Sequence, residues 1–146
     1  MQVVAIIPAR FGSSRFPGKP LAPLAGIPMI LRVYELAKQV PGLDEIYVAT
    51  DDERIITCVQ AGGGQAILTG GQHASGSDRL AEAARLLDLA ALDIVVNIQG
   101  DQLVFPPDLI AELIAALQAD PAAALATPIR RFSDPVQAAN PNAVKV

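Results

Sequence analysis

The sequence contains one cysteine, one histidine and no long uninterrupted apolar run. A single thiol cannot form an internal disulfide, and the apolar neighbours of Cys58 are typical of a buried helical thiol rather than a nucleophile. The richest apolar region, 103–127, is interrupted by polar and charged side chains, so we expect no membrane span. The N-terminus has no cationic segment ahead of its apolar run and is not typical of a secretion signal. These absences predict a protein of the reducing cytoplasm.

Acidic residues are absent from the first 34 positions, which carry four cations, whereas the rest of the chain carries seven cations and fifteen acids. The positive charge is therefore confined to one part of an acidic chain. Broad nucleic-acid binding normally needs a larger basic face. The charge distribution argues against a nucleic-acid partner and favours a small anionic ligand.

What the sequence does contain is a regular alternation of apolar, β-rich runs with amphipathic stretches. The runs that predict strands are 3–9, 46–50, 66–69, 94–99 and 124–129. The stretches that predict helices are 28–40, 51–63, 75–90 and 106–120. This order predicts one α/β domain over 1–146, with a doubly wound, mostly parallel sheet and helices on both faces. In such sheets, ligands bind at the carboxyl ends of the strands.

The loop "ARFGSSRFPGKP", residues 9–20, directly follows the first predicted strand. Gly12, Gly18 and Lys19 resemble a P-loop, but five residues separate the two glycines instead of four. Pro20 replaces the Ser or Thr that would hold magnesium, and it lacks an amide hydrogen. The glycine spacing also fails the dinucleotide fingerprint. The loop suits a triphosphate bound by cations and exposed amides, although solvated surface cations would give the same pattern.

Two further polar segments follow predicted strands. "NIQGD" ends the strand at 94–99 with Asp101, a carboxylate suited to a hard divalent cation, although a turn or cap role fits it as well. "HASGSDR" has Ser75 and Asp78 at capping-box spacing, and it forms either a capped helix start or a polar pocket for a base or anion. A lone histidine in a polar loop is typical of a surface residue, so a catalytic role for His73 is not favoured.

Five motifs, in this order and at these spacings, resemble those of the 3-deoxy-D-manno-octulosonate (Kdo) cytidylyltransferases. They are "IIPARFGSSRFPGKPL", "ATDDERI", "HASGSDRLAE", "VNIQGD" and "NPNAVKV". The resemblance covers nearly the whole chain, and the "GKPL" ending of the loop distinguishes this family from the acylneuraminate cytidylyltransferases. It implies a Rossmann-like, nucleotide-diphospho-sugar transferase-like fold. It also implies a cytoplasmic enzyme of lipopolysaccharide biosynthesis that converts CTP and Kdo to CMP-Kdo and pyrophosphate.

The resemblance also implies roles for individual residues. Arg10 and Lys19 would bind and neutralise the triphosphate during catalysis, with Arg15 close enough to help. The residues implied to line the cytidine pocket are Ala9, Ser75, Gly76 and Arg79. Gln99 would contact the sugar, and the catalytic Asp101 would bind Mg²⁺, which polarises the α-phosphate.

Two departures from the family pattern keep other functions open. The family usually continues "QGD" with Glu and Pro, whereas Gln102 and Leu103 follow here, which affects the shape of the magnesium loop. Family members are also longer, so we expect 1–146 to be the N-terminal part of a cytidylyltransferase that is a homodimer at full length. The alternatives are a non-catalytic nucleotide-binding fragment or regulatory domain, and a nucleotidyltransferase for another sugar. That sugar would be another acidic sugar, such as a neuraminic acid, or a uridylyl or guanylyl acceptor.

Overall fold

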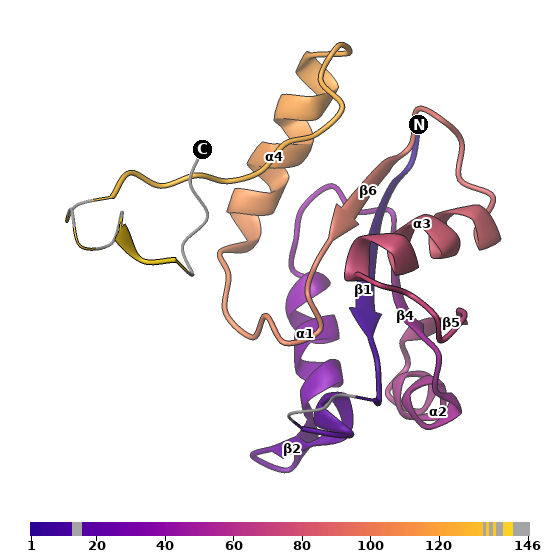
Figure 1. Cartoon of the computed structure of the whole chain (residues 1–146). Helices are drawn as coiled ribbons and strands as arrows, with labels where there is room; N and C mark the ends of the chain where they lie inside the picture. The colour runs from indigo at the N-terminus through magenta and orange to yellow at the C-terminus, as the bar shows by residue number, and fades with distance from the viewer. Residues whose placement is uncertain (13–15, 133, 135, 137–138, 142–146) are drawn as a thin grey trace.

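The computed structural model describes residues 1–12, 16–132, 134, 136 and 139–141. Its centre is a four-stranded parallel sheet in the order β5-β4-β1-β6. The strands are β1 (Val3–Ala9), β4 (Glu45–Thr50), β5 (Gln65–Leu68) and β6 (Ile94–Asn97). The chain adds β4 and β5 on one side of β1 and then places β6 on the other side (Figure 1). The strand order therefore reverses between β1 and β6, which makes this the switch point of the sheet.

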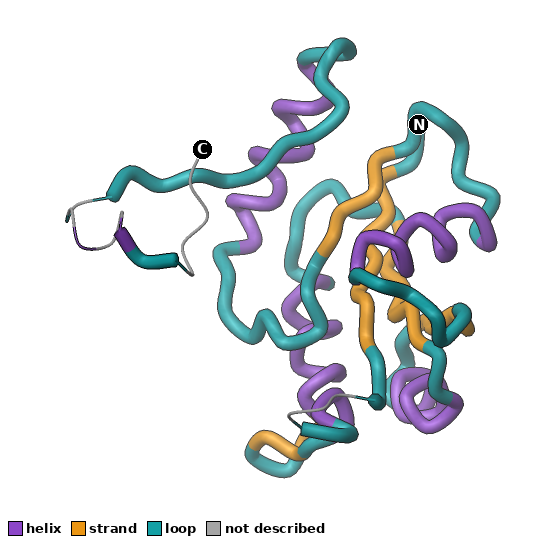
Figure 2. The backbone as a smooth tube through the Cα atoms, in the orientation of Figure 1, coloured by secondary structure: helices purple, strands orange, loops and turns teal. Residues whose placement is uncertain are grey.

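In the described part of the chain, four α-helices connect and cover the strands (Figure 2). They are α1 (Met29–Ala37), α2 (Glu53–Ala61), α3 (Gly76–Leu86) and α4 (Pro107–Ala119). Side chains of α1, α2 and α4 share one core with Val3, Ala5 and Ile7 of β1. On the opposite face, Val4 and Ile6 pack with side chains of α3. The predicted doubly wound α/β fold with helices on both faces is confirmed.

The alternating directions of β1 side chains explain why its run is apolar throughout. Val3, Ala5 and Ile7 face one core and Val4 and Ile6 the other, and all five are at most 4% exposed. A central parallel strand is covered on both faces, so it needs apolar side chains at every position instead of at alternate ones. The strand that carries the candidate site is therefore firmly anchored.

The strand predicted at 124–129 is wrong. This segment has no strand structure, and Leu125 and Ile129 are 80% and 74% exposed. In Figure 1 the chain after α4 runs away from the sheet. Apolar composition makes a strand only where another strand can pair with it, and this segment lies beside none.

A short antiparallel hairpin was not predicted. β2 (Pro23–Leu24) pairs with β3 (Ile27–Pro28), and the two turn residues, Ala25 and Gly26, both have positive φ. In a two-residue hairpin, a turn with positive φ at both central residues matches the twist of the two flanking strands. Within the described part of the chain, no helix combines the length and hydrophobicity needed to cross a bilayer.

Candidate active site

A cavity of about 180 Å³ lies where the switch point meets the beginning of α3. Pro8, Ala9 and Arg10 line it from the end of β1, and Gln99 from the segment after β6. The residues that line it from the β5–α3 loop and from α3 are His73, Ala74, Ser75, Gly76 and Arg79. The structure thus gathers six of the residues predicted for nucleotide or sugar: Ala9, Arg10, Ser75, Gly76, Arg79 and Gln99. Arg15 lies outside the described residues.

The beginning of α3 is fixed by a capping box. Asp78 N donates to Ser75 Oγ over 3.2 Å, and Asp78 Oδ2 accepts from Ser75 N over 3.0 Å and from Ser75 Oγ over 2.8 Å. This reciprocal arrangement satisfies amides that a helix start leaves unpaired. The capping-box prediction is confirmed, and it places the first turn of α3 at the cavity wall.

Arg79 is buried, with only 4% of its surface exposed. Its Nη1 donates to Thr69 Oγ1 over 2.5 Å, and its Nη2 lies 3.4 Å from Asp51 Oδ2. The guanidinium therefore joins the ends of β4 and β5 to α3. Arg79 thus places a positive charge in the wall of the cavity, and Thr69 and Asp51 fix the position of its guanidinium.

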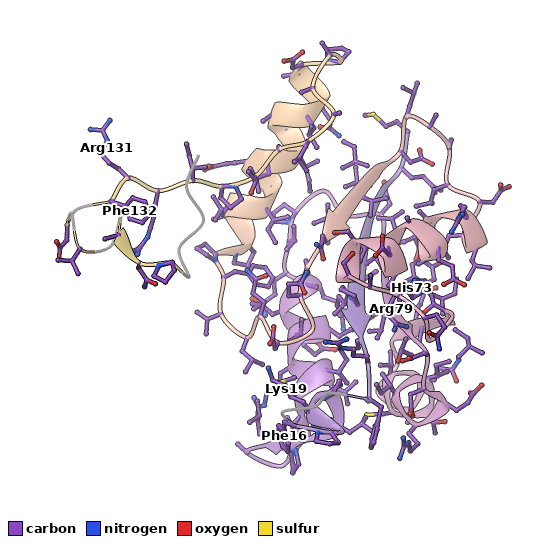
Figure 3. The ribbon with its side chains drawn as sticks, viewed as in Figure 1. Phe16, Lys19, His73, Arg79, Arg131 and Phe132 are labelled. Carbon is purple, nitrogen blue, oxygen red and sulfur yellow. The ribbon has the colours of Figure 1, made fainter. Side chains whose placement is uncertain are left out.

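Lys19 and Asp101 do not line the cavity but pair with each other. Lys19 begins the 3-10 helix η1 (Lys19–Leu21), and Asp101 follows β6. Their Nζ and Oδ2 atoms lie 2.6 Å apart, and both side chains are exposed. Figure 3 shows Lys19 and Phe16 beyond the end of β1, and His73 and Arg79 by α3. The predicted triphosphate cation and the predicted metal ligand are thus neighbours.

The loop that leads to Lys19 is closed by Phe11 and Gly18. Gly18 N donates to Phe11 O over 2.9 Å, and Gly18 adopts a φ of +73°. A Cβ at this position would lie 3.0 Å from the Phe11 ring. The Arg54 guanidinium covers that ring at 3.4 Å from its centroid. These contacts at Phe11 and Gly18 fix the position at which η1 begins with Lys19.

Gly100 allows the segment after β6 to approach β1 closely. A Cβ at position 100 would lie 2.8 Å from the carbonyl oxygen of Pro8, which is closer than real Cβ contacts. The glycine therefore sets the spacing between the residues after β1 and the pair Gln99 and Asp101.

His73 is less exposed than its position in a polar loop predicted: only 16% of its side chain is accessible. Its Nε2 lies 2.5 Å from Glu82 Oε2. Glu82 also accepts from Gly70 N over 3.0 and 3.2 Å. The Gly70 amide, and secondly His73, hold the pKa of the Glu82 carboxyl below its ordinary value. Sequence reasoning missed Glu82, because no pattern in the polar loop pointed to a carboxylate on the following helix.

Asp101 is the side chain here that suits a divalent cation. Its carboxylate is exposed and shares only Oδ2 with Lys19, so oxygen remains for a hard ion. Among the described residues, no three His, Cys, Asp or Glu side chains gather as a metal cluster. Magnesium commonly takes one or two protein carboxylates together with substrate phosphates. The residues present therefore fit a cation that arrives with a triphosphate.

Comparison with known proteins decides the family. The cytidylyltransferase family model matches residues 4–146. The chain belongs to the cytidylyltransferase family. A 3-deoxy-manno-octulosonate cytidylyltransferase of Syntrophobacter fumaroxidans is 54% identical over 100% of this chain and 58% of its own length. An 8-amino-3,8-dideoxy-manno-octulosonate cytidylyltransferase of Shewanella halifaxensis is 49% identical over 100% of this chain and 60% of its own length.

A solved structure of CMP:2-keto-3-deoxy-manno-octonic acid synthetase complexed with CTP matches this chain with a TM-score of 0.77. It is 48% identical and covers 84% of this chain and 49% of that chain. The resemblance predicted from the five motifs is confirmed. The chain spans a little over half the length of the curated relatives it matches.

Proposed function

We propose that this chain carries the nucleotide site of an enzyme that transfers CMP from CTP to Kdo and releases pyrophosphate. The observation that carries the proposal is the cavity at the switch point, which gathers six of the motif residues. Anionic nucleotides suit this position because strand ends and helix N-termini present free backbone amides there. Residues 1–146 would act as the nucleotide-binding α/β unit of the enzyme.

In this proposal, Ala9, Ser75, Gly76 and Arg79 line the cytidine site. Arg10 is exposed at the end of β1 and also lines the cavity, so its guanidinium can donate two parallel hydrogen bonds to phosphate oxygens. Lys19 neutralises the triphosphate as a point charge, with Arg15 assigned to the same task. These cations favour catalysis because negative charge builds on the leaving pyrophosphate in the transition state.

The reaction itself joins the anomeric oxygen of the sugar to the α-phosphorus of CTP. The bond from that phosphorus to the bridging oxygen breaks, pyrophosphate leaves with the electron pair, and the sugar hydroxyl loses its proton. Gln99 lies at the cavity wall next to the strand end and would orient the sugar. Asp101 would hold Mg²⁺, which when bound offsets the charge of the triphosphate.

The test uses the protein expressed from its full reading frame. Pyrophosphate release is measured with CTP and Kdo, with and without Mg²⁺, and then with ATP, GTP or UTP in place of CTP. We expect release only with CTP, Kdo and the divalent cation together. Binding of CTP without any release would instead support a non-catalytic nucleotide-binding domain.

We also propose a cytoplasmic homodimer, which fractionation and sedimentation would test.

The 8-amino-3,8-dideoxy sugar is a second candidate substrate, because the relative from Shewanella halifaxensis named for that sugar is 49% identical. Both sugars have the same reacting end, so the nucleotide site serves either one. A competition assay with equal concentrations of the two sugars would rank them by kcat/KM. We expect Kdo to be preferred, as the relative from Syntrophobacter fumaroxidans has the higher identity.

A further inference from the structure

His73 is the one histidine of the sequence, and it is among the residues that line the cavity. The ring contacts Glu82 through Nε2, and Figure 3 shows it near Arg79 beside α3. Glu82 also holds the amide of Gly70, so one carboxylate fastens both Gly70 and His73 of the β5–α3 loop. The orientation of the ring is therefore set by Glu82, whose carboxylate is itself held by the Gly70 amide.

The partner of Nε2 decides where the proton of His73 sits. An ionised carboxylate only accepts hydrogen bonds, and Glu82 is kept ionised because Gly70 N and His73 lower the pKa of its carboxyl. Nε2 must then carry hydrogen, an assignment that follows from the hydrogen-bond network. In the neutral ring, Nδ1 is left with its lone pair as an acceptor.

Acceptors are scarce among the side chains that line this cavity. Arg10 and Arg79 can only donate, and the Ser75 hydroxyl already accepts from Asp78 N and donates to its carboxylate. Gln99 donates through Nε2 to Asn97, which leaves its Oε1 free. Of the described side chains that line the cavity, the acceptors that remain are thus His73 Nδ1, Gln99 Oε1 and the second lone pair of the Ser75 hydroxyl.

We propose that His73 is a specificity residue that accepts, at Nδ1, a hydrogen bond from the nucleoside in this cavity. Glu82 is the positioning residue that fixes the ring and its tautomer. The inference rests on the proposed function, because it takes the cavity to be the CTP site. Cytidine offers two kinds of donor, the exocyclic amine of the base and the ribose hydroxyls. UTP carries a carbonyl oxygen in place of the amine, so an acceptor at the base would select against it.

Two replacements of His73 distinguish a residue that contacts the ligand from one that only holds the loop in place through Glu82. In His73→Gln, the side-chain amide nitrogen can take the place of Nε2 and still donate to Glu82, but nothing replaces Nδ1. In His73→Asn, the side-chain oxygen lies near the Nδ1 position, but the contact with Glu82 is lost. Gln72→Asn, at the exposed neighbouring position, is the control.

The dissociation constant of CTP is measured by calorimetry on the protein from its full reading frame. We expect His73→Gln to weaken CTP binding about tenfold, the loss of one hydrogen bond, with unchanged melting temperature. His73→Asn should weaken it less. The reverse order, with His73→Gln binding CTP as well as wild type, would mean that His73 only fastens the loop and would overturn the proposal.

Further ligands identify the donor. A penalty for His73→Gln that persists with 2′-deoxy-CTP but is absent with UTP indicates the amine, and a penalty that vanishes with 2′-deoxy-CTP indicates the ribose 2′-hydroxyl. Either result supports the proposal. If wild type binds no CTP at all, the proposed function fails together with this inference. If it binds CTP and only the His73 variants behave as wild type, this inference alone fails.

Glu82→Gln tests the positioning role through a signature that a purely structural role would not change. Its amide can donate to Nε2, which permits the opposite tautomer with the hydrogen on Nδ1. We expect ¹⁵N chemical shifts of His73 to move from the Nε2–H tautomer in wild type toward the Nδ1–H tautomer, and CTP affinity to fall. A wild-type ring that carries its proton on Nδ1 would overturn the proposal without any variant.

Discussion

Lys19 Nζ lies 2.6 Å from Asp101 Oδ2, although 82 residues separate the two in the sequence. The pair joins the segments that follow β1 and β6, on either side of the switch point. The two side chains are 41% and 56% exposed, so water screens the pair and it stabilises the fold by at most about 1 kcal/mol. A contact this weak can be exchanged for stronger partners, a phosphate for Lys19 and a divalent cation for Asp101.

Lys19→Ala should lower pyrophosphate release by at least about a hundredfold, because it removes the cation proposed to stabilise transition-state charge. The free energy of unfolding should change by less than about 1 kcal/mol. Lys38→Ala is the matched control, because Lys38 forms a similar exposed pair, 3.1 Å long, with Glu35. Near-normal turnover without Lys19 would refute its phosphate role.

Asp101→Asn keeps the volume of the side chain and removes the charge assigned to the metal. Activity should fall by several orders of magnitude and should not recover when Mg²⁺ is modestly raised. Asp108→Asn, at the exposed start of α4, should leave activity unchanged. Denaturation curves accompany both assays, since unfolding of Asp101→Asn would indicate a turn-forming role instead.

Gly18→Ala should destabilise the protein more than Gly42→Ala. Both glycines have a positive φ, +73° and +83°, which costs an alanine about 1–2 kcal/mol. Only at position 18 would the added Cβ also meet another side chain, the Phe11 ring at 3.0 Å. The difference between the two variants in urea denaturation measures that contact. Equal losses would show that the ring moves aside freely.

Arg79→Ala should cost about 3 kcal/mol of stability, because Thr69 and Asp51 lose their shared partner in a largely buried setting. Asp51→Ala and the double variant complete a thermodynamic cycle. We expect a coupling of about 1–2 kcal/mol, since Asp51 remains 26% exposed. Additive effects would contradict a direct Arg79–Asp51 interaction.

The stability that Glu82 contributes should depend on pH. Its pKa is lowered on folding from an ordinary value of 4.5, first by the Gly70 amide and then by His73. The folded state therefore favours the ionised carboxylate, so the stabilisation is fully present above pH 4.5 and is lost as pH falls through the lowered pKa. The stability gap between wild type and Glu82→Gln should shrink over that range. A gap that stays constant down to pH 3 would contradict this.

Structural features that depend only on residues close together in the sequence could be predicted from it. The fully apolar run of β1 indicated a central strand, and the Ser75–Asp78 spacing indicated the start of α3. The failed strand at 124–129 has similar apolar residues, but whether a neighbouring strand is available cannot be read from composition.

The contacts of the site depend on the strand order, which places distant residues together. Motifs assigned Lys19 and Asp101 to separate ligands, yet their mutual pairing arises only when β1 and β6 become neighbours. The partly buried state of His73 likewise depends on Glu82, nine residues further along the chain and a helical turn beyond Arg79. A polar loop gives no local sign that a distant carboxylate will hold its histidine.

The close approach of Gly100 to the Pro8 carbonyl fixes the separation between the end of β1 and the segment after β6. A side chain can rotate away from a clash, but a strand carbonyl cannot, so even one methyl group here would wedge the two strand ends apart. The distance between the end of β1 and the segment after β6 is thus set by main-chain atoms. Side chains around this contact can therefore vary while the separation between the end of β1 and the segment after β6 stays the same.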